Sequence, residues 1–298
     1  MNAQTEMSAL ESIQSSGAYK WIMEDANSFA GWESVGGPVV LLIGLGLSLL
    51  GNWLYGGMIG DVSCRYRLSY SPMNGAFGIW GLIYPYMIAS ILFQFLYSYD
   101  SNSFYVARFW SNLLLFVAWT ASGAWTFFFG VADSPNPEVG LGFAAFFLLL
   151  AAITALSAVF VEQGFRADAS WTRILTVSIP FSLYAGWLIV AASINVGIFV
   201  TISLNSNDTI ALCERDPERP NEPLIPDPRG WVDASLPLVL AAVVSVLSIT
   251  QFDFVLILPI IWAISFMKPD NVKIVSIIVA CLSLIVSIVL FYQSRLGR

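Results

Sequence analysis

The chain has 298 residues, of which 57% are hydrophobic and only 11% are charged, and its mean hydropathy is +0.73. This composition excludes an ordinary soluble domain and predicts an all-α integral membrane protein, since lipid forces each spanning segment to satisfy its own backbone groups. The net charge of −7, with scattered basic residues, excludes a nucleic-acid-binding surface. Histidine is absent, which removes the commonest metal ligand and general base, and the three cysteines lie far apart. We therefore expect no metal site, no required cofactor and no catalytic residue.

Eight uncharged apolar runs follow an acidic N-terminal segment, residues 1–36. This segment lacks the basic start of a signal peptide and is predicted to be a solvated tail. The runs are 37–60, 75–99, 109–132, 139–161, 174–204, 234–252, 254–267 and 274–292. A membrane helix needs about 20 residues, so the seventh run is short for a span. Only Asp253 separates it from the sixth run, and seven spans or a re-entrant segment remain alternatives to eight spans.

The connections divide the chain into four parts. Residues 37–204 are predicted to form a five-helix core, and residues 234–298 supply helices six to eight. Between them, residues 205–233 combine proline with charge, which predicts an extended aqueous loop. None of the eight runs contains Asp, Glu, Lys or Arg, and ion-coupled transporters place such residues at membrane depth. An ion-coupled transporter is therefore disfavoured.

Aromatic residues recur at helical spacing in three of the runs. The stripes comprise Phe77, Trp80 and Tyr84 in the second run, Trp119, Ser122, Trp125 and Phe129 in the third, and Tyr184, Trp187 and Asn195 in the fifth. Trp and Tyr often gather at membrane interfaces, but several of these lie well inside their runs. Each stripe is therefore interpreted either as ordinary helix packing or as the lining of a pocket. Asn195 alone fits an interhelical hydrogen bond better than a ligand contact.

Prolines and glycines add weaker indications. Pro85, Pro180, Pro237 and Pro259 lie in apolar runs and are expected to kink their helices. Residues 56–60 fit the GxxxG pattern of helix packing, which is frequent in apolar helices.

Three segments resemble one known family, the tryptophan-rich sensory proteins, also called the translocator (TspO/MBR) or peripheral benzodiazepine receptor family. They are SPMNGAFGIWGLIY at 71–84, GAWTFFFG at 123–130 and PFSLYAGWLIVAASIN at 180–195. The likeness covers about 37–199 and continues through 252–271, as in longer bacterial-type members with extra C-terminal helices. Ser122 stands where the family usually has asparagine, and the family's loop tryptophan has only tyrosines as substitutes here.

The resemblance implies a five-helix core whose cavity opens toward the loop between its first two helices and binds a tetrapyrrole or sterol-like ligand. The ligand-binding residues are then expected to be Phe77, Trp80, Tyr84, Ser122, Trp125, Tyr184, Trp187 and Asn195. Arg65 and Arg67, in that loop, are expected to meet the acidic edge of a porphyrin, although basic residues beside a helix end also fix orientation.

The sequence thus predicts a multi-pass membrane receptor or carrier for a planar apolar ligand such as a porphyrin. The alternative is a structural or assembly subunit of a larger membrane complex, and enzymatic breakdown of a porphyrin is less favoured. Membrane lipids are the expected surroundings, a homodimer or larger complex is compatible with the composition, and the sequence does not identify the membrane.

Overall fold

The computed structural model describes residues 17–66, 68, 71–72, 74–96, 102–132, 136–163, 171–204, 239, 242–249, 253–267 and 271–296. Within these ranges the regular structure is entirely helical. The helices are α2 (Gly17–Arg65), η1 (Asn74–Ile79), α3 (Trp80–Leu96), α4 (Asn102–Gly130), α5 (Pro137–Gln163), α6 (Trp171–Arg173), η3 (Ile174–Ser178), α7 (Ile179–Leu204), α9 (Leu258–Ser265) and α10 (Asn271–Leu296). The first of them begins inside the segment predicted as a tail, whereas the loop 205–233 lies outside the described residues.

Six helical segments in the described part of the chain are long and apolar enough to cross a membrane. They are Gly36–Ser63, Gly75–Leu96, Arg108–Gly130, Pro137–Gln163, Trp171–Ser203 and Lys273–Gln293. The first five predicted runs and the last are therefore confirmed as helices, with shifts of a few residues at their ends. The chain is an all-α, multi-pass integral membrane protein.

The sixth and seventh predicted runs behave differently. The sixth is described only at residues 239 and 242–249, which are helical. The seventh forms α9, whose eight residues extend about 12 Å at 1.5 Å per residue. The hydrocarbon core is about 30 Å thick, so α9 does not cross it. This part of the chain agrees with the alternative of a short or re-entrant segment rather than with a full seventh span.

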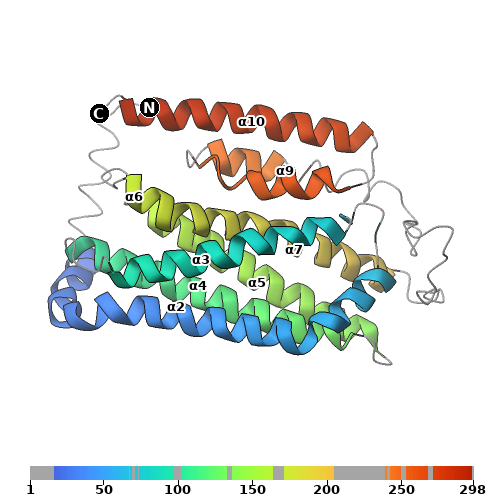
Figure 1. The fold of residues 1–298 in the computed structure, drawn as a ribbon, viewed down its shortest axis with the longest axis horizontal. Coiled ribbons are helices and arrows are strands. Elements are labelled where there is room, and N and C mark those ends of the chain that lie inside the picture. Colours follow the sequence, from blue (N-terminus) through green and yellow to red (C-terminus); the bar gives the residue numbers. More distant parts are fainter. Residues whose placement is uncertain are drawn as a thin grey trace.

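The helices pack in an order different from their order in the chain. Helices α2, α4, α5 and α7 contact one another successively, and α3 touches both α2 and α7 (Figure 1). On the other side of α7, α9 lies between α7 and α10. The predicted five-helix core is thus one packed unit, onto which the C-terminal helices dock through α7.

Glycines allow α2 and α4 to approach closely. A Cβ atom added to Gly51 would lie 2.6 Å from Thr126 Oγ1, and one added to Gly123 would lie 3.2 Å from the Leu47 carbonyl oxygen. Gly56 and Gly60, the residues of the GxxxG pattern, have no such neighbour within 4 Å among the described residues. The α2–α4 contact therefore depends on other glycines than the pattern indicates.

The prolines have different local roles. Pro85 lies within α3, and Pro180 follows the π-helical turn η3 in the first turn of α7. The carbonyl of Leu175, in η3, accepts a hydrogen bond of 2.5 Å from the Tyr86 hydroxyl of α3. Pro259 lies in the first turn of α9. Backbone N–H groups there have no partner within the helix, so a proline costs no hydrogen bond, and Pro259 starts a helix rather than kinking one. Pro237 lies outside the described residues.

Candidate functional site

Five aromatic rings from three helices meet inside the core. They belong to Trp80 and Tyr84 of α3, Trp119 of α4, and Tyr184 and Trp187 of α7, and we call them the aromatic cluster. Spacings of four and three residues put each pair on one face of its helix. Trp80 stacks on Tyr84 with ring centroids 4.9 Å apart. Rings from stripes on three separate spans therefore lie together inside the core.

Trp80 contacts all four other rings of the aromatic cluster, and Trp119 contacts three of them. Trp119 stacks on Tyr184 at 3.9 Å with an angle of 8° between the ring planes, and on Tyr84 at 5.7 Å. The Trp80 centroid lies 6.3 Å from that of Trp119 and 6.2 Å from those of both Tyr184 and Trp187. These distances are those of direct aromatic contact. The rings consequently pack against one another rather than standing apart around a space.

Burial differs across the aromatic cluster. Trp119, Tyr184 and Trp187 are at most 2% exposed, whereas Trp80 and Tyr84 are only partly buried. Phe77 of η1 is 41% exposed, yet its ring contacts Trp187 at 6.1 Å. The side formed by η1 and the start of α3 is therefore the accessible side of the aromatic cluster.

Polar groups line the edges of the rings. Asn52 of α2 donates to the Tyr84 hydroxyl at 3.1 Å. The Ser48 hydroxyl lies beside that of Tyr84, and the Ser122 hydroxyl lies beside that of Tyr184. The fully buried Trp119 Nε1 has no hydrogen-bond acceptor among the described residues. A buried donor without a partner costs about 1–3 kcal/mol, so an acceptor at this position would be favourable.

Trp125 and Asn195 form a separate pair. The Trp125 Nε1 donates to Asn195 Oδ1 at 2.9 Å, and the ring stacks on Phe129 at 5.5 Å. Six residues separate Trp119 from Trp125, which is about 120° around a helix and 9 Å along it. Asn195 thus joins α7 to α4 as the interhelical partner that its sequence suggested.

The predicted site residues therefore fall into three groups. Phe77, Trp80, Tyr84, Tyr184 and Trp187 are brought together, with Ser122 at the edge. Trp125 and Asn195 bind each other. Arg65 is the last residue of α2 with its side chain outside the described part, and Arg67 lies outside the described residues. The sequence already placed Trp119 in a stripe, but only its neighbours in space show that it stacks on rings of α3 and α7.

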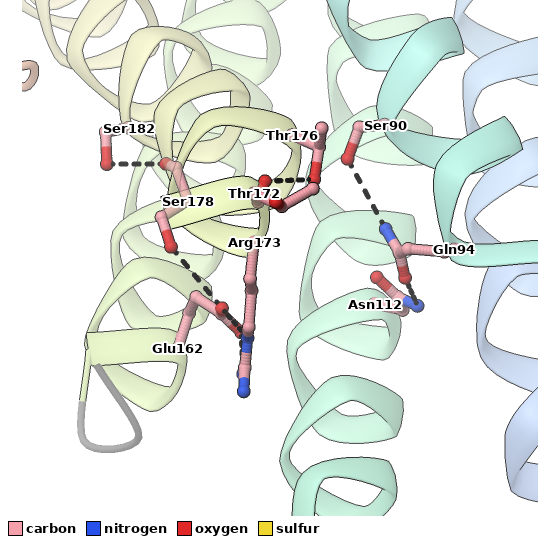
Figure 2. A network of polar contacts seen from close by, with 9 residues as sticks. All are labelled: Ser90, Gln94, Asn112, Glu162, Thr172, Arg173, Thr176, Ser178 and Ser182. Atoms are coloured by element: carbon pink, nitrogen blue, oxygen red, sulfur yellow. Dashed lines mark hydrogen bonds and ion pairs between the residues drawn. The ribbon is translucent and has the colours of Figure 1, made fainter. Parts of the chain in front are cut away.

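Charged residues are also buried, at the ends of the apolar runs. Glu162 of α5 accepts two hydrogen bonds from Arg173 of α6, at 2.9 and 3.0 Å, and one from Ser178 at 3.4 Å (Figure 2). Glu162 is 2% exposed and Arg173 8%. Asp253, just before α9, accepts from Ser182 and Gln163, both at 2.6 Å.

A second polar group lies between α3 and α4. Asn112 of α4 donates to Gln94 of α3 at 2.8 Å, and Gln94 reaches Ser90 (Figure 2). These side chains are buried although they belong to membrane helices. Sequence reasoning missed the first network because Glu162, Arg173 and Asp253 stand immediately outside the uncharged runs, where charge is usually solvated. It missed the second because Gln94 and Asn112 lie inside apolar runs and carry neither a charge nor an aromatic ring. Among the described residues, no three Cys, Asp or Glu side chains are grouped as metal ligands would be.

One of the comparisons with known proteins identifies a family. No curated protein and no solved structure matches the chain. The family model described as TSPO-like protein matches residues 38–211, more than half of the 298 residues. This range contains every ring of the aromatic cluster and ends before the C-terminal helices. The chain therefore belongs to the TSPO-like protein family.

Proposed function

We propose that this protein is a membrane receptor or carrier that binds a planar, largely apolar ligand, a tetrapyrrole or a sterol-like molecule, at the aromatic cluster. The observation that carries the proposal is the meeting of five Trp and Tyr rings from α3, α4 and α7, together with the buried indole N–H of Trp119, which has no acceptor among the described residues. Aromatic faces stack on a flat apolar ring system, and each such contact contributes about 0.5–1.5 kcal/mol beyond the burial of its area.

The geometry indicates where such a ligand would enter. Carbon atoms in contact are about 3.5–4 Å apart, so two rings that hold a disc between them need about 7 Å between their planes. Trp119 and Tyr184 are 3.9 Å apart and fully buried, and they leave no such space. Trp80 is partly buried and meets Trp187 edge-on at 6.2 Å. The ligand is therefore proposed to enter between Trp80 and Trp187. Its entry requires η1 and the start of α3, the accessible side of the aromatic cluster, to move outward.

Polar atoms around this place would orient the ligand. The indole N–H of Trp119 needs an acceptor, and an imine-type nitrogen of a porphyrin, a carbonyl oxygen or a hydroxyl oxygen could supply one. The Tyr184 hydroxyl, which also has no hydrogen-bond partner among the described residues, adds a further donor. A ligand with one apolar face and few polar atoms fits this surface.

Titration of the purified protein tests the proposal. Protoporphyrin IX is added while its absorbance and the tryptophan fluorescence are followed, and cholesterol is added as a competitor in a second series. We expect Trp80→Leu and Trp187→Leu each to weaken binding about tenfold, which corresponds to one aromatic contact of about 1.4 kcal/mol. Trp53→Leu is the control, because this α2 residue is 80% exposed.

Two results would contradict the proposal. If both cluster variants bind like the wild type, the ligand site lies elsewhere. If the wild type binds neither ligand and migrates as part of a larger assembly after gentle extraction, the chain is a structural subunit instead.

A further inference from the structure

The accessible side of the aromatic cluster begins with a weak element. Phe77 belongs to η1, a 3₁₀ helix of six residues that leads directly into Trp80. We call Phe77 and Trp80 the η1 wall. Hydrogen bonds in 3₁₀ helices have poorer geometry than those in α-helices, so such segments are short and often act as hinges. The two glycines at 75 and 78 give η1 little side-chain packing of its own. Its conformation must therefore be fixed by contacts with other elements.

Helix α9 supplies these contacts. Trp262 Nε1 donates a hydrogen bond of 2.8 Å to the carbonyl oxygen of Ala76, which is fully buried. Four residues further on, at the C-terminal cap of α9, the Phe266 ring lies against Gly75, where an added Cβ would lie 2.6 Å from Phe266 Cε1. The rings of Trp262 and Phe266 contact each other at 4.9 Å. One side chain of α9 and one at its C-terminal cap thus contact two consecutive residues of η1.

The chain at and just before the start of α9 also packs against α7. Gly186 of α7 packs against the carbonyl oxygen of Leu256 and against Pro259, whose Cγ would lie 3.1 Å from an added Cβ. Gly186 stands between Tyr184 and Trp187 in the sequence of α7, and we call these two residues the α7 wall. The segment 256–266 therefore contacts both η1, which carries Phe77, and α7, which carries the α7 wall. The two walls meet where Phe77 and Trp80 contact Trp187, at 6.1 and 6.2 Å.

We propose that α9 holds the η1 wall closed against the α7 wall and so controls how fast a planar ligand enters, an inference that rests on the proposed function. Trp262 is then a positioning residue, since it touches η1 and not the aromatic cluster. Helix α9 lies outside residues 38–211, the range matched by the family model. The control is thus exerted by the C-terminal part of this chain on the site in its core.

Hydrogen–deuterium exchange on the full chain in detergent micelles tests whether α9 holds η1. Trp262→Phe removes the N–H donor and keeps a ring against Phe266. Hydrogen bonds between membrane helices are worth about 0.6–1.7 kcal/mol, so we expect exchange of the 74–80 amides to rise about three- to eighteenfold. Exchange in α4 and α5 should not change. Trp53→Phe, an exposed tryptophan of α2, is the matched control.

A second variant and a second measurement sharpen the test. Gly75→Ala should displace the Phe266 ring and raise exchange in the same segment without removing the Trp262 hydrogen bond. In stopped-flow mixing with protoporphyrin IX, Trp262→Phe should associate at least threefold faster, because its wall opens more easily.

The outcomes separate the two proposals. Unchanged exchange at 74–80, or a rise spread equally over all core helices, overturns the role of α9. A local rise with an unchanged association rate overturns its control of entry. A wild type that does not bind protoporphyrin or cholesterol overturns the proposed function, and the exchange result then still decides whether α9 holds η1.

Discussion

Trp119 and Trp125 are two buried tryptophans of one helix that differ in their hydrogen bonding. Trp125 donates to Asn195, whereas the Trp119 N–H has no acceptor among the described residues. The difference arises from position alone, because 120° around α4 separates a ring that reaches Asn195 from one that enters the aromatic cluster. Comparing the two tryptophans therefore measures the free energy that the unpaired Trp119 donor costs.

Replacement by phenylalanine should affect these two residues unequally. Trp119→Phe loses ring contacts, which destabilises the protein. It also removes an unpaired buried donor and so recovers the cost of about 1–3 kcal/mol that this donor imposes, and the two effects nearly cancel. Trp125→Phe loses its hydrogen bond and leaves Asn195 Oδ1 without that donor, and should lower the free energy of unfolding by about 1–2 kcal/mol more than Trp119→Phe. Chemical unfolding of both variants in the same detergent measures this. Equal losses, or a larger loss for Trp119→Phe, would show that Trp119 has an acceptor.

The buried pair Glu162 and Arg173 provides a second test at single residues. Removing one partner leaves the other charge buried, so Arg173→Leu should destabilise the protein by about 3–5 kcal/mol. The double variant Glu162→Leu with Arg173→Leu removes both charges and should recover most of that loss. A double-mutant cycle in detergent measures the coupling. Losses that simply add would mean that the two side chains do not depend on each other.

Among the helices, α2 and α4 have a contact that depends on small residues. Gly51 and Gly123 face each other across it, and an added Cβ on Gly51 would lie 3.0 Å from the Gly123 carbonyl oxygen. Small residues let helix backbones approach in lipid, where van der Waals packing replaces the hydrophobic effect as the attraction. This contact holds Ser48 and Asn52 of α2 beside Tyr84 and so positions one edge of the aromatic cluster.

Adding one methyl group distinguishes this contact from the open glycines. Gly51→Ala should destabilise the protein by about 1–3 kcal/mol, because the methyl group would overlap Thr126 Oγ1. Gly56→Ala should leave stability unchanged or slightly raised, since nothing described lies within 4 Å and alanine favours a helix. Thermal unfolding compares the two variants. A destabilised Gly56→Ala would indicate that this face of α2 packs against another molecule.

On the scale of the whole molecule, one carboxylate joins the C-terminal helices to the core. Asp253 is 1% exposed and accepts hydrogen bonds from Gln163 of α5 and Ser182 of α7. The Ser248 hydroxyl donates to the Asp253 carbonyl and also bonds Ser287 of α10. These contacts extend from α5 to α10, and the C-terminal helices are thus connected to the core by polar bonds as well as by the packing at Gly186.

Loss of this carboxylate should therefore loosen the C-terminal helices first. Asp253→Ala removes the acceptor of three hydrogen bonds, from Gln163, Ser182 and the backbone N–H of Val255, and a hydrogen bond to a charged group is worth about 1.5–3 kcal/mol. Hydrogen exchange should rise in α9 and α10 and remain unchanged in α4 and α5. Ser283→Ala is the control, because Ser283 bonds only within α10, to the Val279 carbonyl. A uniform rise over all helices would show that Asp253 stabilises the core as a whole.

The residues that the sequence placed well are those whose neighbours lie on the same helix. Trp80 and Tyr84, like Tyr184 and Trp187, share a face because of their spacing, and both pairs were expected at the site. Trp125 had the same helical spacing and turned out to bind Asn195, since spacing gives a face but not the element that meets it. The hydrogen bond from α9 to η1 was not foreseen, because Trp262 and Ala76 are 186 residues apart in the sequence.

Composition and the length of the apolar runs were enough to determine an all-α membrane protein, its core helices and the faces on which its rings lie, because lipid leaves the backbone few other choices. Only the tertiary structure decided that Trp119 stacks on Tyr84 and Tyr184, that Glu162 and Asp253 are buried, and that the seventh run stops short of a span. These features depend on how helices rotate and pair. The rotation and pairing of the helices are set by contacts between elements distant in sequence, at glycines such as Gly51, Gly123 and Gly186. No local sequence pattern predicts these contacts.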